Sequence, residues 1–477
     1  MRNLYVLLFL LWTGKSVLAQ EVDRSVPPVP GKAEALKLPE VKSFTLSNGL
    51  RIFLLENNAL PLIQFQLMFN AGSVFDPADK SGLSNLVFDL VDDQTADRAP
   101  EAWADALDYL GVELESFSRA EQGGIRLFTP LSRVEPALDL LAAMLLRPDF
   151  PEGAIAQKKQ SQLLRLTQEY SNARLLAAQA MRTLLYGKDH PLGKRFAGSK
   201  KSLEAISRTD VLEFADTFIR PQNAYLVVAG AIGEADLQAL LEPRLQNWTG
   251  GQWHALAIPP PADTVHYKRL YILDVPEKQQ TELRFIQLGP GAATEDYFAV
   301  QVMNTILGGT FASRLNLSLR EKKGLAYGAA SGFYFPSAYG YFVAQANVKG
   351  DVTGVAIRAF LEEFEGMSAV STDEFERALS FLTNSFPKKF ESLQSSAEEI
   401  SRIVCYGLPH DFLCTYNASL QQLQLEDIKS AAARYILPQQ MIVLAVGDRA
   451  TIEAQLRELN LGPAAVLEVW DVLGDQP

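Results

Sequence analysis

Two residues close together in the C-terminal half, Arg320 and Tyr327, have side chains suited to binding carbonyl oxygens. A phenol can donate a hydrogen bond to an oxyanion as it forms, and a planar guanidinium can clamp a neighbouring carbonyl group. Arg320 ends an amphipathic segment and Gly324 suits the residue that closes a helix, so the pair is expected at one helix-to-strand corner. Local sequence alone favours a simpler alternative, a surface arginine beside a tyrosine packed in the core.

The usual catalytic patterns are missing. The sequence contains no HExxH, HxxEH, CxxC or GxSxG motif. It has only four histidines, and no two of them stand at a ligand spacing such as i,i+4. We therefore expect surface or turn histidines, and no metal bound by this chain. The histidines are His190, His254, His266 and His410.

The composition is that of a globular protein. The 477 residues are 48% hydrophobic and 10% aromatic, which excludes a largely disordered chain. At about 150 residues per domain, the length predicts roughly two to four folded units. The net charge of −12 argues against general nucleic-acid binding, which requires basic charge. After the N-terminal segment, no apolar run approaches the roughly 18 residues that span a bilayer.

The first twenty residues have the pattern of a cleavable signal peptide. Arg2 precedes an apolar run from Leu4 to Trp12, and Val17-Leu18-Ala19 offers a cleavage site for signal peptidase. A buried N-terminal strand is the alternative. We expect removal of residues 1–19 and a periplasmic or secreted mature chain.

The elements that would position Arg320 and Tyr327 belong to an alternation of strands and helices, which favours layered α/β or α+β units. Ser47-Asn48-Gly49 predicts a tight hairpin inside the segment 44–55, because Asn-Gly accepts positive φ. Further strands are expected at 63–70, 224–229, 270–273 and 282–288. Helices are expected at 82–92, 100–110, 134–146, 153–170, 175–185, 208–218 and 297–307.

A repeated pattern indicates two homologous halves. Asp210, Pro221 and Gly230 mark a helix, a turn and a strand end, and Asp427, Pro438 and Gly447 mark the same three points. Each pair is separated by 217 positions (427 − 210, 438 − 221, 447 − 230). We predict an N-terminal domain at 38–249, a Pro-rich linker at 250–265 and a C-terminal domain at 266–470.

The two cysteines, Cys405 and Cys414, flank the turn Gly407-Leu408-Pro409. In an oxidising compartment they could form a disulfide if their Cα atoms approach within about 7 Å. Two buried thiols are the alternative, and the sequence leaves the choice open.

Two stretches resemble the pitrilysin/insulinase family of zinc peptidases, in particular its mitochondrial-processing-peptidase-like members. Ala71-Gly72-Ser73, Asp76-Pro77 and Gly82-Leu83 look like the approach to the family's inverted zinc motif HxxEH. The segment from Leu307 to Tyr327 is similar to the LGG…SRL…REKRGLAY signature of the family's second half. His190-Pro191-Leu192-Gly193 also fits, so the resemblance runs from about Phe44 to the C-terminus.

The chain departs from the family at the zinc motif. When Gly82-Leu83 is placed on the family's pattern, Asn85 and Asp89 fall where the two zinc histidines would stand. Phe88 falls where the catalytic glutamate would be. The family's third ligand is a glutamate in the region that resembles 153–170, but here the first acidic residue of that region is Glu169. Asparagine is a poor zinc ligand and phenylalanine cannot deprotonate water. We expect an abandoned zinc site.

The resemblance implies an α+β clamshell-type subunit with two homologous halves, each a mixed or antiparallel sheet covered on one face by helices. It also implies that Arg320 and Tyr327 hydrogen-bond the substrate backbone at the scissile carbonyl. The chain would then be the zinc-less subunit of a heterodimeric metallopeptidase. A homologous partner subunit would supply HxxEH and zinc, and unfolded peptide would bind by adding a strand to a sheet edge.

Two other functions stay open. Relatives of this fold serve as structural subunits of membrane complexes, and the chain could be such a non-catalytic assembly protein. It could also be a module that holds peptides without cutting them. The retained Arg320 and Tyr327 favour the peptidase subunit, because a purely structural chain has no evident need for that pair.

Overall fold

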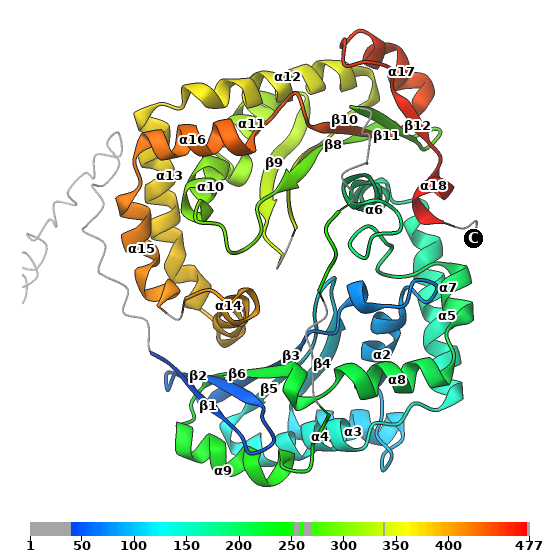
Figure 1. Ribbon diagram of the computed structural model, residues 1–477, viewed down its shortest axis with the longest axis vertical. Coiled ribbons are helices and arrows are strands. Elements are labelled where there is room, and N and C mark those ends of the chain that lie inside the picture. Colours follow the sequence, from blue (N-terminus) through cyan, green and yellow to red (C-terminus); the bar gives the residue numbers. More distant parts are fainter. Residues whose placement is uncertain (1–39, 252–256, 262–268, 337–338, 410, 475–477) are drawn as a thin grey trace, which may run out of the picture. The chain divides into compact units, whose positions relative to one another are not determined.

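The computed structural model describes residues 40–251, 257–261, 269–336, 339–409 and 411–474 (Figure 1). The expected signal peptide at 1–19 and most of the expected linker at 250–265 lie outside the described residues. None of the described helices is long and apolar enough to cross a bilayer.

The first sheet has six strands in the order β1-β2-β6-β3-β5-β4. β2 and β6 run parallel, and all other neighbours are antiparallel. The expected Asn-Gly hairpin joins β1 to β2, with Gly49 at a φ of 89°. The sequence analysis did not pick out β4 and β5, which complete one edge. The strands are β1 (Val41–Thr45), β2 (Arg51–Glu56), β3 (Leu62–Phe69), β4 (Glu113–Ser118), β5 (Gly123–Pro130) and β6 (Ala224–Gly230).

The second sheet also has six strands, in the order β12-β7-β11-β8-β10-β9. Five of them repeat the order and direction of β2-β6-β3-β5-β4. The sheets differ in the sixth strand, because β1 is antiparallel to its neighbour whereas β12 is parallel to its own. The strands are β7 (Leu270–Asp274), β8 (Gln280–Gly289), β9 (Ala326–Tyr334), β10 (Gly340–Lys349), β11 (Ile442–Gly447) and β12 (Ala465–Leu467).

The internal repeat is visible in the structure as well as in the sequence. Helix α8 (Arg208–Phe218) precedes β6, and helix α16 (Leu425–Tyr435) precedes β11. The two helices are 217 positions apart at both ends (425 − 208, 435 − 218). β6 and β11 end at the same offset, on Gly230 and Gly447.

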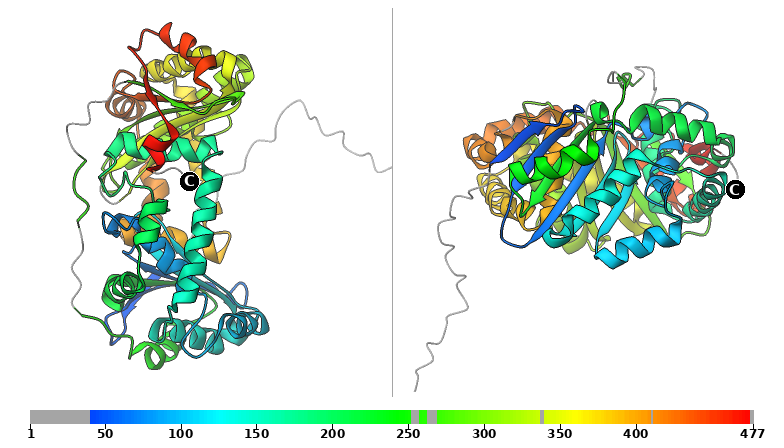
Figure 2. Two further views of the ribbon diagram at one scale, coloured as in Figure 1. Left: turned by 90° about the vertical axis from the view of Figure 1, so that its right-hand side faces the viewer. Right: turned by 90° about the horizontal axis from the view of Figure 1, so that it is seen from below.

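Helices of the same half cover one face of each sheet. In the first half, Leu54 and Phe65 point into a core shared with α2, α4, α8 and α9. In the second half, Leu283 and Phe285 face α10, α12 and α16. Figure 2 shows α5 as one continuous helix that leads into α6. The larger helices are α2 (Leu83–Val91), α3 (Pro100–Leu110), α4 (Val134–Leu146), α5 (Glu152–Glu169), α6 (Ala173–Tyr186), α9 (Glu234–Leu245), α10 (Tyr297–Asn304), α12 (Thr353–Glu365), α13 (Thr372–Ser385), α14 (Leu393–Tyr406), α15 (Phe412–Gln422) and α17 (Arg449–Arg457).

The other face of each sheet is covered by a helix from the opposite half. Helix α14 of the second half packs on β3 and β6 of the first sheet, against Met68 and Tyr225. Helix α6 of the first half packs on β8 and β11 of the second sheet, against Ile286 and Leu444. Each half therefore completes the other half's hydrophobic core.

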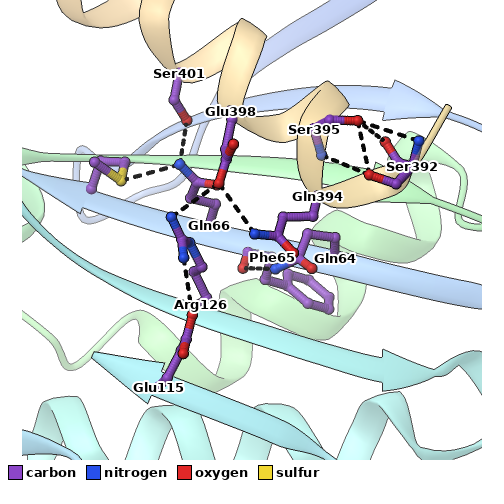
Figure 3. A network of polar contacts seen from close by, with 11 residues as sticks. Gln64, Phe65, Gln66, Glu115, Arg126, Ser392, Gln394, Ser395, Glu398 and Ser401 are labelled. Carbon is purple, nitrogen blue, oxygen red and sulfur yellow. Dashed lines mark hydrogen bonds and ion pairs between the residues drawn. The ribbon is translucent and has the colours of Figure 1, made fainter. Parts of the chain in front are cut away.

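Polar contacts fix α14 on the first sheet (Figure 3). Gln66 donates a hydrogen bond to the Ser401 hydroxyl at 3.1 Å, and the Tyr225 hydroxyl donates to the Ser401 carbonyl at 3.1 Å. Arg126 on β5 forms an ion pair with Glu398 on α14 at 3.0 Å. The α+β fold with two homologous halves is confirmed, and the exchanged helices add a second cover to each sheet.

Candidate functional site

The approach to the degenerate zinc motif has a structural role. The buried carboxylate of Asp76 accepts hydrogen bonds from the backbone amides of Gly82 at 2.7 Å and Ser84 at 2.8 Å, at the start of α2. Gly82 has a φ of 95°, a conformation that favours glycine. Burial raises the pKa of Asp76 to about 7 despite these hydrogen bonds. This stretch sets where α2 begins.

The three degenerate positions all lie on α2 and are all engaged in packing or protein contacts. The Asn85 amide donates to the carbonyl of Phe196. Phe88 is only 1% exposed, and its ring lies so close to Gly123 that an added Cβ there would approach within 2.0 Å. Asp89 accepts an ion-paired hydrogen bond from Arg165 at 2.5 Å.

Arg165 is the residue that the sequence analysis missed. We considered Glu169 as the acid of α5, but Glu169 pairs with Arg195 at 2.5 Å, one turn farther along the helix. The side chain of α5 that faces Asp89 is the guanidinium of Arg165, which a pattern of acidic zinc ligands does not predict. The Gln162 side chain, one turn earlier, is buried and donates to the Ala197 carbonyl at 3.0 Å.

These residues do not fit a zinc ion. Asn85 could offer zinc only a neutral amide oxygen, which is a poor ligand, and the carboxylate of Asp89 already has a cationic partner. A guanidinium has no lone pair to offer a metal. Within the described part of the chain, no group of three or more His, Cys, Asp or Glu side chains could hold a metal ion.

The LGG and SRL parts of the second signature also have structural roles. Gly308 lies in a π-helical turn, Thr305–Gly309, and an added Cβ would come within 2.4 Å of the Ser331 amide on β9. Arg314 forms a two-pronged ion pair with Glu374 at 2.6 and 2.7 Å, and donates to the Gly366 carbonyl at 2.6 Å. Because of this pair, the pKa of Glu374 falls to about 2.

Asparagine side chains hold β9 in place beside these turns. The carbonyl oxygen of Asn316 accepts from the Ala329 amide at 3.2 Å, and its nitrogen donates to the Phe311 carbonyl at 2.7 Å. Asn304 accepts a hydrogen bond from the Ser331 hydroxyl at 2.7 Å. The strand that carries Tyr327 is therefore anchored along its length.

Arg320 lies in a second π-helical segment, Leu317–Lys322, where the sequence favoured an ordinary helix. Its guanidinium sits 4.3 Å from the centre of the Phe311 ring and 3.4 Å from the Glu321 carboxylate. The expected helix end at Gly324 is confirmed, with a φ of 62°.

Tyr327 is the second residue of β9, which is the outer strand of its sheet. Its side chain is 100% exposed. The alternative that Tyr327 packs in the core is therefore wrong, and the phenol is available to a molecule outside this chain.

A cavity of about 860 Å³ adjoins this pair. Its wall includes Phe311, on which Arg320 stacks, and Gly328, which follows Tyr327. The second sheet, the π-helical turn that ends at Gly309 and the turn between α5 and α6 also contribute to the wall. The cavity thus combines residues of both halves.

The two cysteines are free, so the disulfide is absent from the structure. The alternative of two buried thiols is also wrong for Cys414, which is exposed. Cys405 is half-buried, and burial raises the pKa of its thiol to about 12.

Comparison with known families supports this description. Residues 52–195 match the insulinase family, peptidase family M16, and residues 205–382 match the peptidase M16 inactive domain. The chain belongs to the insulinase family. The crystal structure of a peptidase M16 inactive domain from Pseudomonas fluorescens is similar to this insulinase-family chain, with 25% identity and a TM-score of 0.80, over 86% of this chain and 98% of that one.

Several curated relatives of this insulinase-family chain span most of its length. An uncharacterized zinc protease of Rickettsia felis is 24% identical over 75% of this chain and 85% of its own. The non-peptidase homolog YmxG of Helicobacter pylori is 26% identical over 78% and 86%. Subunit 1 of the mitochondrial cytochrome b-c1 complex of Caenorhabditis elegans is 21% identical over 91% and 93%.

Proposed function

We propose that this chain is the non-zinc-binding subunit of a heterodimeric metallopeptidase that cleaves unfolded peptides. A homologous partner subunit carries the HxxEH motif and the zinc ion. This chain contributes Arg320 and Tyr327 to the partner's site. The observation that carries the proposal is the full exposure of Tyr327 on an anchored outer strand.

The first half supports a role without metal. Its three degenerate positions are engaged by Phe196, by the core and by Arg165. The match to an inactive domain and the similarity to a non-peptidase homolog agree with that reading. Hydrolysis therefore requires chemistry that this chain does not contain.

The second half supports a role in binding the reacting group. Tyr327 donates a hydrogen bond to the carbonyl oxygen of the scissile bond as negative charge develops on it. Arg320, oriented by the Phe311 ring, donates to a neighbouring peptide carbonyl. β9 presents an outer edge beside both residues, and an extended peptide can add to that edge as a further strand.

Mixing the subunits tests the proposal. The mature chain, the partner subunit and their mixture are each incubated with a quenched fluorescent peptide that has no stable structure. We expect rapid hydrolysis only in the mixture. Full activity of the partner alone, unchanged on addition of this chain, would contradict the proposal.

The similarity to a cytochrome b-c1 complex subunit supports a second candidate, a non-catalytic assembly protein. In that case the chain would form a stable complex whose formation does not depend on Arg320 or Tyr327 and which cleaves no peptide. A third candidate, a module that only holds peptides, predicts peptide binding without hydrolysis in any mixture.

We also infer that the chain is exported after removal of residues 1–19, on the basis of its leader pattern. N-terminal sequencing of the mature protein should begin near Gln20 or Glu21. Recovery of intact Met1 in a cytoplasmic fraction would contradict export.

A further inference from the structure

The 860 Å³ cavity beside Arg320 and Tyr327 has a charge pattern of its own. Three charged side chains line it: Arg174 from the first turn of α6, Lys278 from the segment before β8, and Glu282 from β8. The other polar residues of the lining are uncharged, with amide side chains such as Gln345 and Asn347. The net charge of these three side chains determines whether the cavity favours an anionic or a cationic ligand.

The single carboxylate of the lining is already compensated. Glu282 lies 3.4 Å from the guanidinium of Arg284, and both side chains are buried. Burial raises the pKa of Glu282, and the nearby guanidinium of Arg284 opposes that shift. Glu282 therefore cannot neutralise the two cations at the same time.

Among the described residues neither cation forms an ion pair with a carboxylate, although Arg174 lies within electrostatic range of Glu282. Lys278 donates to the Ser171 carbonyl at 3.0 Å, a neutral acceptor that leaves its charge uncompensated. The described residues provide no hydrogen-bond acceptor for the Arg174 guanidinium, whereas its backbone carbonyl accepts from Arg284 at 3.0 Å. The first turn of α6 contains no acidic residue, so the helix dipole adds to the positive potential.

We infer that this cavity is a subsite for a carboxylate of the bound peptide, held by Arg174 and Lys278. The inference rests on the proposed function for the identity of the ligand, a peptide placed across Arg320 and Tyr327. The carboxylate can come from an Asp or Glu side chain or from the C-terminus of the peptide, because both present the same group. The chain has a net charge of −12, but here two cations without an ion pair line a concave surface, which favours an anionic ligand.

Binding to this chain alone tests the subsite without hydrolysis. Three labelled peptides of otherwise identical sequence are titrated by fluorescence anisotropy into the purified mature chain. The first has one internal Glu and an amidated C-terminus, the second has Gln in its place, and the third has Gln with a free C-terminus. We expect a carboxylate-bearing peptide to bind about 10-fold more tightly than the amidated Gln peptide, with a preference that weakens as salt is raised.

Substitutions test whether Arg174 and Lys278 cause the preference for a carboxylate. Arg174→Gln combined with Lys278→Gln should abolish it, while the affinity for the amidated Gln peptide stays unchanged. Arg358→Gln, which removes one charge from an exposed pair with Glu458 on another part of the second half, should keep it. The internal-Glu and free-C-terminus peptides show which carboxylate is recognised, and a preference for either supports the subsite.

Several outcomes would overturn the inference. These are equal binding of all three peptides, no binding of any, a preference that survives the double substitution, and displacement of every peptide alike by inorganic phosphate. The proposed function fails separately, if the mixture with the partner subunit does not hydrolyse peptide while the carboxylate preference of this chain persists.

Discussion

The ion pair between Asp89 and Arg165 shows how single residues convert a metal site into a protein contact. A zinc site needs several lone pairs directed at one point, whereas a carboxylate and a guanidinium satisfy each other directly. The neighbouring Asn85 donates a hydrogen bond to the Phe196 carbonyl, and Phe88 is buried in the core. Each position of the motif is thus engaged in contacts within the protein.

We predict that the purified chain holds far less than one zinc ion per molecule after dialysis. Arg165→Ala should not introduce zinc binding, because it frees only the Asp89 carboxylate and one carboxylate beside a neutral asparagine cannot hold the ion. It should lower the free energy of unfolding by no more than about 1 kcal/mol, since the pair is largely exposed. Metal analysis and urea unfolding measure the two effects, with Arg377→Ala, from the exposed pair with Asp373, as control. A tightly held stoichiometric zinc would contradict the abandoned site.

Substitutions of Tyr327 and Arg320 should change the kinetics of peptide hydrolysis in different ways. In the reconstituted heterodimer, Tyr327→Phe should lower kcat by about 10²–10³ with little change in KM, because it removes a hydrogen bond made mainly in the transition state. Arg320→Ala should also raise KM, because its clamp already engages the bound peptide. Neither change should affect dimer assembly or the partner's zinc.

Asn85→Ala and Asp89→Ala are the controls for these kinetics and should leave turnover nearly unchanged. Wild-type activity of Tyr327→Phe, together with loss of activity in either control, would place the chemistry in the first half. Arg320 and Tyr327 would then be structural.

At the scale of elements, the turns around Arg320 and Tyr327 depend on contacts from distant segments. Arg314 joins the start of α13 to the turn after α12 through Glu374 and Gly366. Gly308 lets the π-helical turn approach β9. Together they fix the corner from which Arg320 and Tyr327 project.

The pair between Arg314 and Glu374 makes stability depend on pH. Its folded pKa of about 2 lies below the ordinary value, so the ionised carboxylate stabilises the fold above about pH 4.5 and this contribution is lost as pH falls towards 2. Between pH 7 and pH 3, wild type should therefore lose about 2 kcal/mol of unfolding free energy more than Glu374→Gln. Urea unfolding at both pH values measures this difference.

Glu376→Gln is the matched control, because Glu376 is an exposed carboxylate on the same helix. It should lose as much stability in acid as wild type. Identical acid sensitivity of Glu374→Gln and wild type would show that the pair with Arg314 does not set the pKa.

At the scale of the whole molecule, the halves depend on each other for their cores. α14 covers Met68 and Tyr225 on the first sheet, and α6 covers Ile286 and Leu444 on the second. Exposing either face to water would cost about 25 cal/mol for each Å² of apolar surface. The two halves should therefore unfold together.

A fragment of residues 20–249 tests this dependence, since it lacks α14. It should bind the dye ANS and melt at a much lower temperature than the full mature chain, because one face of its sheet is uncovered. Calorimetry of the full chain should show a single transition, and Arg126→Ala, which loses the ion pair with Glu398, should lower its midpoint. Two well-separated transitions, or a fragment as stable as the full chain, would contradict the dependence.

The sequence by itself indicated the repeat, the bounds of several helices in the first half and the replacement of the zinc-ligand residue types. The helices at 100–110, 134–146 and 208–218 were predicted with the observed bounds, because periodic apolar residues and Pro100 are local signals. The replacement of the zinc ligands is likewise evident from the residue types at positions 85, 88 and 89.

Only the tertiary structure decided the contacts between distant segments. The pairing of Asp89 with Arg165, the exchange of α6 and α14, and the cavity with Arg174 and Lys278 each join residues far apart in the chain. The strands β4 and β5 carry mixed polar and apolar side chains without a clear strand pattern. Their place in the sheet follows from the pairing of β5 with β3. A sequence pattern indicates which face of a helix or strand is apolar. Which other element covers that face depends on the packing of the whole chain.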